Sequence, residues 1–170
     1  MSAIVHRVRL EDCEPQPWRN GGGLTRELLL WPPAATPAAT QDWAVRVSVA
    51  DIARNGPFSS YPGVERWFAV LEGAGVTLGL PDGDHRLRRG DTPVRFAGTD
   101  APACHLIEGR PTRDLNLMVR HGSGRMWKAQ AGEPVDSRTR WRALYAATQV
   151  RVQTPAGNTE TLEPGTLLWS

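Results

Sequence analysis

The residues of this chain that are best placed to do chemistry are polar groups set within alternating apolar segments. Arg46 and Ser48 alternate with Val45, Val47 and Val49, so in a strand the two polar residues share the face opposite the valines. In an antiparallel sheet that face lies against solvent or lines a cavity. A cavity with a guanidinium and a hydroxyl suits a small carboxylate, because Arg can donate to both carboxylate oxygens at once.

A second alternating segment places an amide beside a thioether. Asn116 and Met118 share one face, and Leu115, Leu117 and Val119 share the other. The amide could orient a polar group of a ligand while the thioether packs against the ligand's carbon skeleton. The same amide could equally satisfy backbone groups at a strand edge.

A run of three glycines follows an asparagine in Asn20-Gly21-Gly22-Gly23. Such a run allows positive φ and can present its N–H groups as a nest for an anion, although no Lys-Ser/Thr pair follows as in a phosphate loop. The alternative is a turn or bulge that lets the first strand cross the sheet. Thr25 follows the run, either as part of a polar pocket wall or on an edge strand.

Adjacent strand residues point to opposite faces, which limits two further candidates. Of Glu65 and Arg66, only one can line an interior. Cys104 and His105 diverge in the same way, so one faces inward and the two cannot form a nucleophilic dyad. Phe58 would add an apolar wall to such an interior, although a phenylalanine usually belongs to the core.

Length and composition indicate a globular protein of 170 residues in one compact domain, with 40% hydrophobic and 22% charged residues. The net charge of +2 gives no electrostatic reason to expect nucleic acid as a partner. Cys13 and Cys104 form no CxxC or Cys/His cluster, so neither a zinc site nor a disulfide scaffold is expected. Without a signal peptide or a long apolar run, the sequence predicts a cytoplasmic protein that does not enter a membrane.

Glycine and proline, 17 and 14 in number, are scattered at short intervals and would interrupt long helices. The alternating segments between them predict an all-β, antiparallel sandwich or barrel. The proline-rich residues 31–40 are expected to form a surface loop. The predicted strands lie within residues 42–52, 64–73, 75–80, 85–98, 103–109 and 114–120.

Two segments share a pattern of strand, Pro-x-Gly turn and strand. Residues 76–83 align with residues 150–157 at a constant offset of 74 positions. The match indicates two related β-units, the second of them shorter. Hairpin turns are degenerate in sequence, so a chance likeness is the alternative.

Residues 57–78 and 88–98 resemble the first and second cupin motifs. Metal-binding cupins carry several histidines and a glutamate there, and of these ligands only Glu65 is present. The resemblance therefore implies an interior without a metal, in which Glu65 points inward. A buried carboxylate needs a partner, and Arg46 is the expected one.

Four segments together resemble the HutD/Ves family of cupin-like bacterial proteins: residues 17–28, 42–73, 94–98 and 114–120. The resemblance implies a RmlC-like bicupin, with a first cupin-like unit at about 43–120 and a shorter second unit at about 121–170 packing with the N-terminal strands. Members are often encoded with histidine-utilisation genes, and a regulatory, ligand-binding role is proposed for them. The other branch is named for induction by environmental stress.

These observations predict a metal-free protein, without cofactor or catalytic residue, that binds a small carboxylate such as urocanate or formylglutamate. A first alternative is a metal-independent isomerase or hydrolase that uses Glu65 or His105 as acid and base. A second is a dimerising module, because seven tryptophans exceed the need of one core and aromatic residues favour interfaces. The tryptophans are Trp18, Trp31, Trp43, Trp67, Trp127, Trp141 and Trp169.

Overall fold

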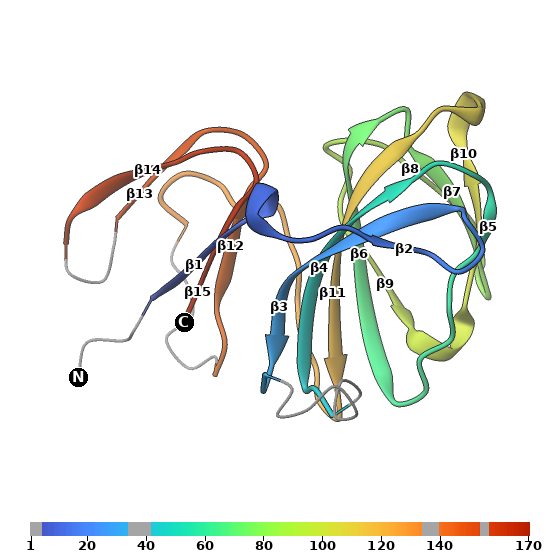
Figure 1. Ribbon diagram of the computed structural model, residues 1–170, viewed down its shortest axis with the longest axis horizontal. Coiled ribbons are helices and arrows are strands. Elements are labelled where there is room, and N and C mark those ends of the chain that lie inside the picture. Colours follow the sequence, from blue (N-terminus) through green and yellow to red (C-terminus); the bar gives the residue numbers. More distant parts are fainter. Residues whose placement is uncertain (1–4, 34–41, 134–139, 154–156) are drawn as a thin grey trace. The chain divides into compact units, whose positions relative to one another are not determined.

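The computed structural model describes residues 5–33, 42–133, 140–153 and 157–170 (Figure 1). The chain groups into two compact units: residues 15–128 form one, and residues up to 14 together with those from 129 onward form the other. Of the residues described, no helix is long and apolar enough to span a bilayer. All of the predicted functional residues lie in the larger unit.

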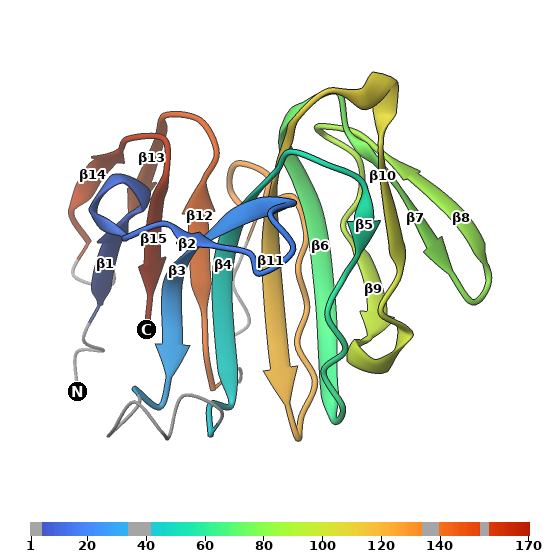
Figure 2. The ribbon, with the colours of Figure 1, turned by 45° about the vertical axis from the view of Figure 1, so that its right-hand side comes forward.

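The larger unit is built on a six-stranded antiparallel sheet (Figure 2). In spatial order its strands are β2 (Gln16–Pro17), β3 (Gly23–Trp31), β4 (Val45–Ile52), β11 (Thr112–Arg120), β6 (Val64–Gly73) and β9 (Val94–Ala97). Strand β11 pairs with β4 on one side and with β6 on the other, although both partners precede it by more than 35 residues.

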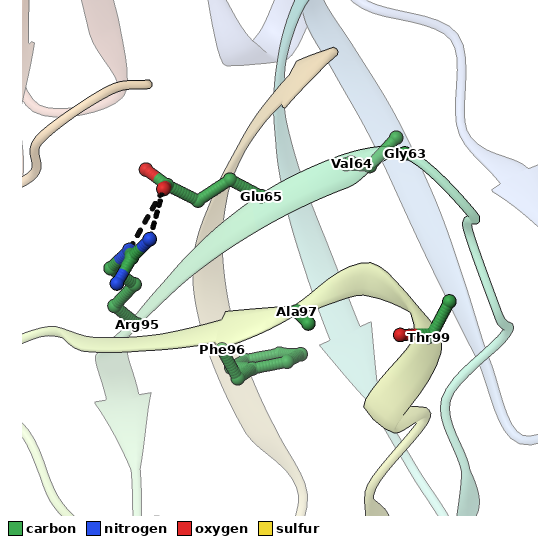
Figure 3. A pocket seen from close by; sticks show the side chains of 7 residues that line it. All are labelled: Gly63, Val64, Glu65, Arg95, Phe96, Ala97 and Thr99. Carbon is green, nitrogen blue, oxygen red and sulfur yellow. Dashed lines mark hydrogen bonds and ion pairs between the residues drawn. The ribbon is translucent and has the colours of Figure 1, made fainter. Parts of the chain in front are cut away.

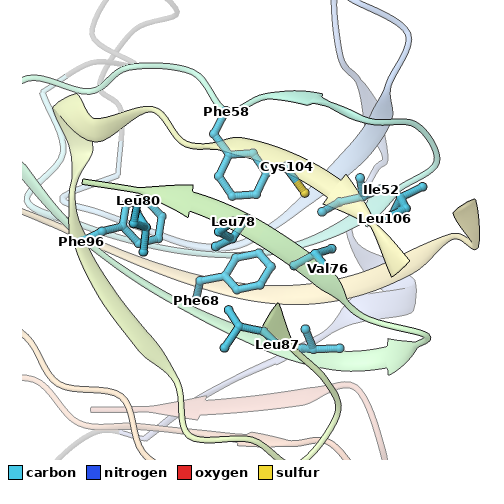
Figure 4. Close-up of a cluster of buried hydrophobic side chains, with 11 residues drawn as sticks. Ile52, Phe58, Phe68, Val76, Leu78, Leu80, Leu87, Phe96, Cys104 and Leu106 are labelled. Atoms are coloured by element: carbon cyan, nitrogen blue, oxygen red, sulfur yellow. The ribbon is translucent and has the colours of Figure 1, made fainter. Parts of the chain in front are cut away.

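A four-stranded sheet lies against one face of the six-stranded sheet. Its order is β5 (Gly56–Pro57), β10 (Ala103–Leu106), β7 (Val76–Leu80) and β8 (Gly83–Leu87). Side chains from both sheets meet in one apolar cluster, in which Phe68, Val76 and Leu78 are 0% exposed (Figure 4). We call the face of the six-stranded sheet that bears Phe68 the inner face.

Within the described residues, short 3-10 turns lie at Leu10–Asp12, Gly98–Asp100 and Ile107–Gly109. The predicted all-β character is confirmed, and the expected strands form close to the predicted residues. The predicted segment 85–98 divides into β8 and β9, because Arg88 and Asp91 close a tight turn between them. Of the predicted loop at 31–40, Trp31 ends β3, and residues from 34 onward lie outside the described part.

The smaller unit contains a three-stranded sheet of β1 (His6–Arg9), β15 (Thr166–Trp169) and β12 (Ala143–Ala146). A separate hairpin joins β13 (Val150–Gln153) to β14 (Thr159–Leu162). The first segment of the sequence repeat covers β7 and the start of β8, which pair antiparallel. The second begins with β13, which pairs antiparallel with β14, and its residues 154–156 lie outside the described part. Their relationship as two cupin units stays a prediction.

Candidate functional site

The polar residues singled out in the sequence meet on the inner face, because the registers of three strands align them. Met118 of β11 lies between Arg46 of β4 and Arg66 of β6. Two residues further along, Asn116 lies between Ser48 and Phe68. The side chains of Ser48, Arg66, Asn116 and Met118 are all at least 95% buried, while the valines of β4 occupy the outer face.

Arg66 is the centre of this arrangement, and it is only 4% exposed. Its Nη2 donates to Asn116 Oδ1 at 3.0 Å, and its Nη1 donates to the carbonyl of Ser59 at 3.3 Å. Its Nε is buried and has no hydrogen-bond partner in the part of the chain that the structure describes. Three aromatic rings surround the guanidinium at 5.0 to 5.7 Å and favour the cation: Phe58, Tyr61 and Phe96.

Asn116 connects Arg66 to a second buried ionisable group, Asp114. The amide of Asn116 donates to Asp114 Oδ1, and no described residue is hydrogen-bonded to Asp114 Oδ2. Burial raises the pKa of Asp114 well above its usual value; Arg66 opposes that rise and Asp51 adds to it. Burial lowers the pKa of Arg66 to about 10, which still leaves the guanidinium charged at neutral pH.

Among the described residues no carboxylate is hydrogen-bonded to the Arg66 guanidinium, because Asn116 stands between it and Asp114. Burial favours the neutral form of Asp114, and any charge on Asp114 would stabilise the cation. An uncompensated buried guanidinium is costly, and a bound anion would relieve that cost. The arrangement thus makes Arg66 a donor that an anionic group would satisfy.

Arg46 lies towards the more open end of the inner face. Its Nε donates to Glu27 Oε2 at 3.0 Å, and the two side chains are 16% and 29% exposed. The positive charge of Arg46 contributes to the lowered pKa of Arg66, so the two guanidinium groups lie close enough to repel. Solvent reaches this end of the face, while Arg66 stays enclosed.

Glu65 points away from the inner face, so the expectation of an inward Glu65 paired with Arg46 is wrong. Its carboxylate accepts from Arg95 Nε at 2.8 Å, Gly124 N at 3.0 Å and Trp67 Nε1 at 3.1 Å. Burial acts to raise the pKa of Glu65, but these three donors together hold it below its usual value. The alternation of β6 explains this orientation, because Arg66 and Phe68 occupy buried positions on the inner face and Glu65, next to Arg66, points to the opposite face.

The outward face at Glu65 borders a hollow of about 360 Å³ (Figure 3). Its lining combines the Glu65–Arg95 ion pair with small side chains such as Ala97 and Thr99. The cation and the carboxylate already neutralise each other there, so this hollow lacks the uncompensated charge found at Arg66.

His105 is exposed, while Cys104 beside it is 1% exposed and faces the core. Burial, with a smaller effect of Asp114, raises the pKa of Cys104 to about 12 and keeps the thiol protonated. Because His105 is exposed and Glu65 points outward, neither side chain can act as an acid or base on the inner face. Among the described residues no three His, Cys, Asp or Glu side chains gather as a metal site would require.

The glycine run forms a tight turn between β2 and β3. Gly21 has a φ of +68° and donates to the carbonyl of Trp18, and Gly22 N donates to Asn20 Oδ1 at 2.8 Å. These N–H groups are used within the turn, so the turn alternative holds and the anion nest does not. Thr25 accepts from Trp18 Nε1 at 2.7 Å, which fixes the start of β3.

Asp114 and Tyr61 belong to the site and were missed in the sequence. Asp114 continues the alternation of Asn116 and Met118 by one step, so the period of two could have indicated its face. Tyr61 lies in the connection before β6, where no periodicity applies, and only the folded chain brings its ring to Arg66.

The HutD family model matches residues 10–170 of the chain. Protein Ves of Citrobacter koseri is 46% identical over 104 residues, which make up 61% of this chain and 51% of that protein. Protein Ves of Cronobacter sakazakii is 41% identical over 105 residues, 61% of this chain and 54% of that protein. The chain thus matches about half the length of these two relatives.

Two solved structures are similar over almost the whole chain. HutD from Pseudomonas fluorescens SBW25 is 26% identical with a TM-score of 0.68, over 98% of this chain and 87% of that one. A conserved protein of unknown function from Pseudomonas aeruginosa PAO1 is 22% identical with a TM-score of 0.70, over 98% of this chain and 85% of that one. The second likeness concerns the fold alone.

Proposed function

Because this chain belongs to the HutD family, with an all-β, cupin-like fold, we propose that its inner face binds a small carboxylate at Arg66. The observation that carries the proposal is the buried Arg66 guanidinium, whose Nε has no hydrogen-bond partner among residues 5–33, 42–133, 140–153 and 157–170. A carboxylate would supply both the missing acceptor and the missing negative charge.

The surroundings of Arg66 support a ligand more than a purely structural ion pair. A structural pair would place an ionised carboxylate directly on the guanidinium, as Glu65 does for Arg95 on the outer face. Arg66 instead meets an amide, a backbone carbonyl and three aromatic rings. Asn116 and Phe58 orient the guanidinium without neutralising it.

We extend the proposal to a regulatory role in histidine catabolism or in the stress response, with urocanate and formylglutamate as the first ligands to test. The proposed binding uses no metal, since Ser59, Ser60 and Pro62 stand where the cupin pattern carries histidines. A cytoplasmic location and a homodimer belong to the same proposal. Catalysis by Glu65 or His105 is not part of it, because both side chains face away from Arg66.

The test is a calorimetric titration of the purified protein with urocanate, formylglutamate, glutamate and histidine at pH 7. We expect at least one acid to bind, and the Arg66→Met variant to weaken that binding by about 10- to 100-fold, the range of hydrogen bonds to charged groups. Methionine fills a similar space without a charge, so the variant should keep its fold, which a thermal melt would check.

The matched control is Arg95→Gln, which removes an arginine from the outer face, where its side chain is 63% exposed. This variant should bind as the wild type does. Equal weakening by both variants, or a folded wild type that gives no binding heat with any acid, would overturn the proposal.

A further inference from the structure

We infer that Glu65 is a latch, a side chain that fastens residues 121–128 to the six-stranded sheet. These residues form the connection that leaves β11, and they are the last part of the larger unit before the chain enters the smaller unit at residue 129. Glu65 faces away from Arg66, so this role is independent of the proposed carboxylate site. The glutamate of the first cupin motif thus has a role in this chain that needs no metal ion.

The carboxylate of Glu65 binds donors from three parts of the larger unit. Its Oε1 accepts from Gly124 N at 3.0 Å and from Trp67 Nε1 at 3.1 Å. Its Oε2 lies 2.8 Å from Arg95 Nε and 2.6 Å from Arg95 Nη2 (Figure 3). An ionised carboxylate has about four acceptor positions, and these contacts use all of them. Trp67 and Arg95 lie opposite each other in the register of β6 and β9, so the sheet fixes the carboxylate that binds Gly124.

The charge of Glu65 strengthens its bond to the connection. Burial acts to raise the pKa of Glu65, but Arg95, Gly124 and Trp67 together hold it below the usual value, so the carboxylate is ionised at neutral pH. A hydrogen bond from a backbone N–H to an ionised carboxylate is about twice as strong as one to a neutral acceptor. The Glu65 side chain is 11% exposed, so water competes little for the N–H of Gly124.

The connection comes close enough for this bond because two of its residues are glycines. A Cβ on Gly124 would lie 2.8 Å from Val119 Cγ2 and 3.4 Å from Leu117 Cδ2. A Cβ on Gly122 would lie 3.6 Å from Val119 Cγ1, which is an ordinary contact. The chain therefore turns back after β11 and lies against the outer face of that strand (Figure 2). A larger residue in place of Gly124 would push the backbone away from Glu65.

Glu65 holds the connection between its two ends. At the start, the N–H of His121 donates to a backbone carbonyl in the turn before β6. At the far end, the ammonium group of Lys128 lies beside the turn between β8 and β9. Among the described residues, Gly124 donates the only hydrogen bond that joins residues 122–128 to the rest of the chain. Loss of that bond would leave this stretch held by side-chain contacts alone.

Limited digestion with trypsin tests the latch, because Arg125 and Lys128 are exposed cleavage sites within the connection. Cleavage requires local opening, and its rate follows the open population when opening and closing are fast. Glu65→Ala leaves the N–H of Gly124 without its acceptor, so we expect cleavage at these sites to be about 10- to 100-fold faster. Glu65→Gln keeps an uncharged acceptor, so we expect an increase of about 3- to 10-fold. Hydrogen exchange of the Gly124 amide should rise by the same factors.

The matched control is Glu72→Ala, which removes a carboxylate and its ion pair with Arg113 from the opposite end of β6. This variant should be cleaved at the wild-type rate. Hydrogen exchange of the Val47 amide in β4 reports opening of the whole sheet and should be unchanged in both Glu65 variants. Equal cleavage of the wild type and both Glu65 variants would overturn the inference. Equal acceleration by Glu72→Ala would also overturn it, as would exchange at Val47 that rises as much as exchange at Gly124.

Discussion

Replacement of Asp114 by asparagine should change how the stability of this protein depends on pH. Asp114 is completely buried, and among the described residues its side chain accepts a hydrogen bond from Asn116 alone. Burial raises its pKa above the ordinary value of 3.8. Asparagine has the same shape and can still accept from Asn116, but it cannot ionise.

The sign of the effect follows from the direction of this shift. A group whose pKa is raised in the folded state stabilises the fold fully below its unfolded pKa, and this stabilisation is lost as the pH rises through the folded pKa. Between those two values the free energy of unfolding of the wild type should fall, relative to Asp114→Asn, by about 1.4 kcal/mol per pH unit. Two pH units within this window correspond to about 2.7 kcal/mol.

Urea unfolding of both proteins at half-unit steps from pH 3.5 to 8 would measure this difference. Groups common to both proteins cancel in the comparison. The control is Asp51→Asn: burial acts to raise the pKa of Asp51, but Arg113 and Arg26 lower it on balance, so its contribution is present above the unfolded pKa and lost on acidification. A wild-type curve that stays parallel to the Asp114→Asn curve across the whole range would refute the argument that the buried carboxyl is neutral.

Two further predictions concern the packing of the larger unit. Cys104 is buried, and its pKa is raised to about 12, so its thiol should resist a thiol reagent at pH 8 in the folded protein. The partly exposed Cys13 should react. Equal reaction rates for the two thiols would contradict this prediction. A Cβ on Gly23 would lie 2.3 Å from the carbonyl oxygen of Asp51, so Gly23→Ala should lower the free energy of unfolding by about 1–3 kcal/mol in a urea titration. An unchanged midpoint would show that β3 can shift away from β4 without cost.

The sequence alone was enough to predict that Arg46 and Ser48 share one strand face, as do Asn116 and Met118, because alternation along one strand is a local property. It could not show that these two strands are neighbours. The pairing of β11 with β4 and β6 joins segments far apart in the chain, and nothing in their residues specifies the partner.

The choice between Glu65 and Arg66 shows a second limit. Because Glu65 and Arg66 are adjacent, either one of them could point inward. The cupin comparison favoured Glu65 as the inward residue, because a metal-binding glutamate stands at this position in the cupin pattern. In this chain the three aromatic rings around Arg66 favour a cation inside, and Arg95, Trp67 and Gly124 hold the carboxylate outside. Those partners come from other strands and loops, so the sequence near Glu65 does not reveal them.

The central position of β11 has a consequence for how this protein can tolerate changes in length. The strand is hydrogen-bonded along both edges, so a residue inserted at its middle would have to displace two ladders at once. An insertion just before Leu115 would make every later side chain change faces, and Leu115 and Leu117 would take the places of Asn116 and Met118 beside Arg66. Insertions and deletions in functional members should therefore be confined to the connections between strands, and a gap inside β11 would mark a relative that has lost this site.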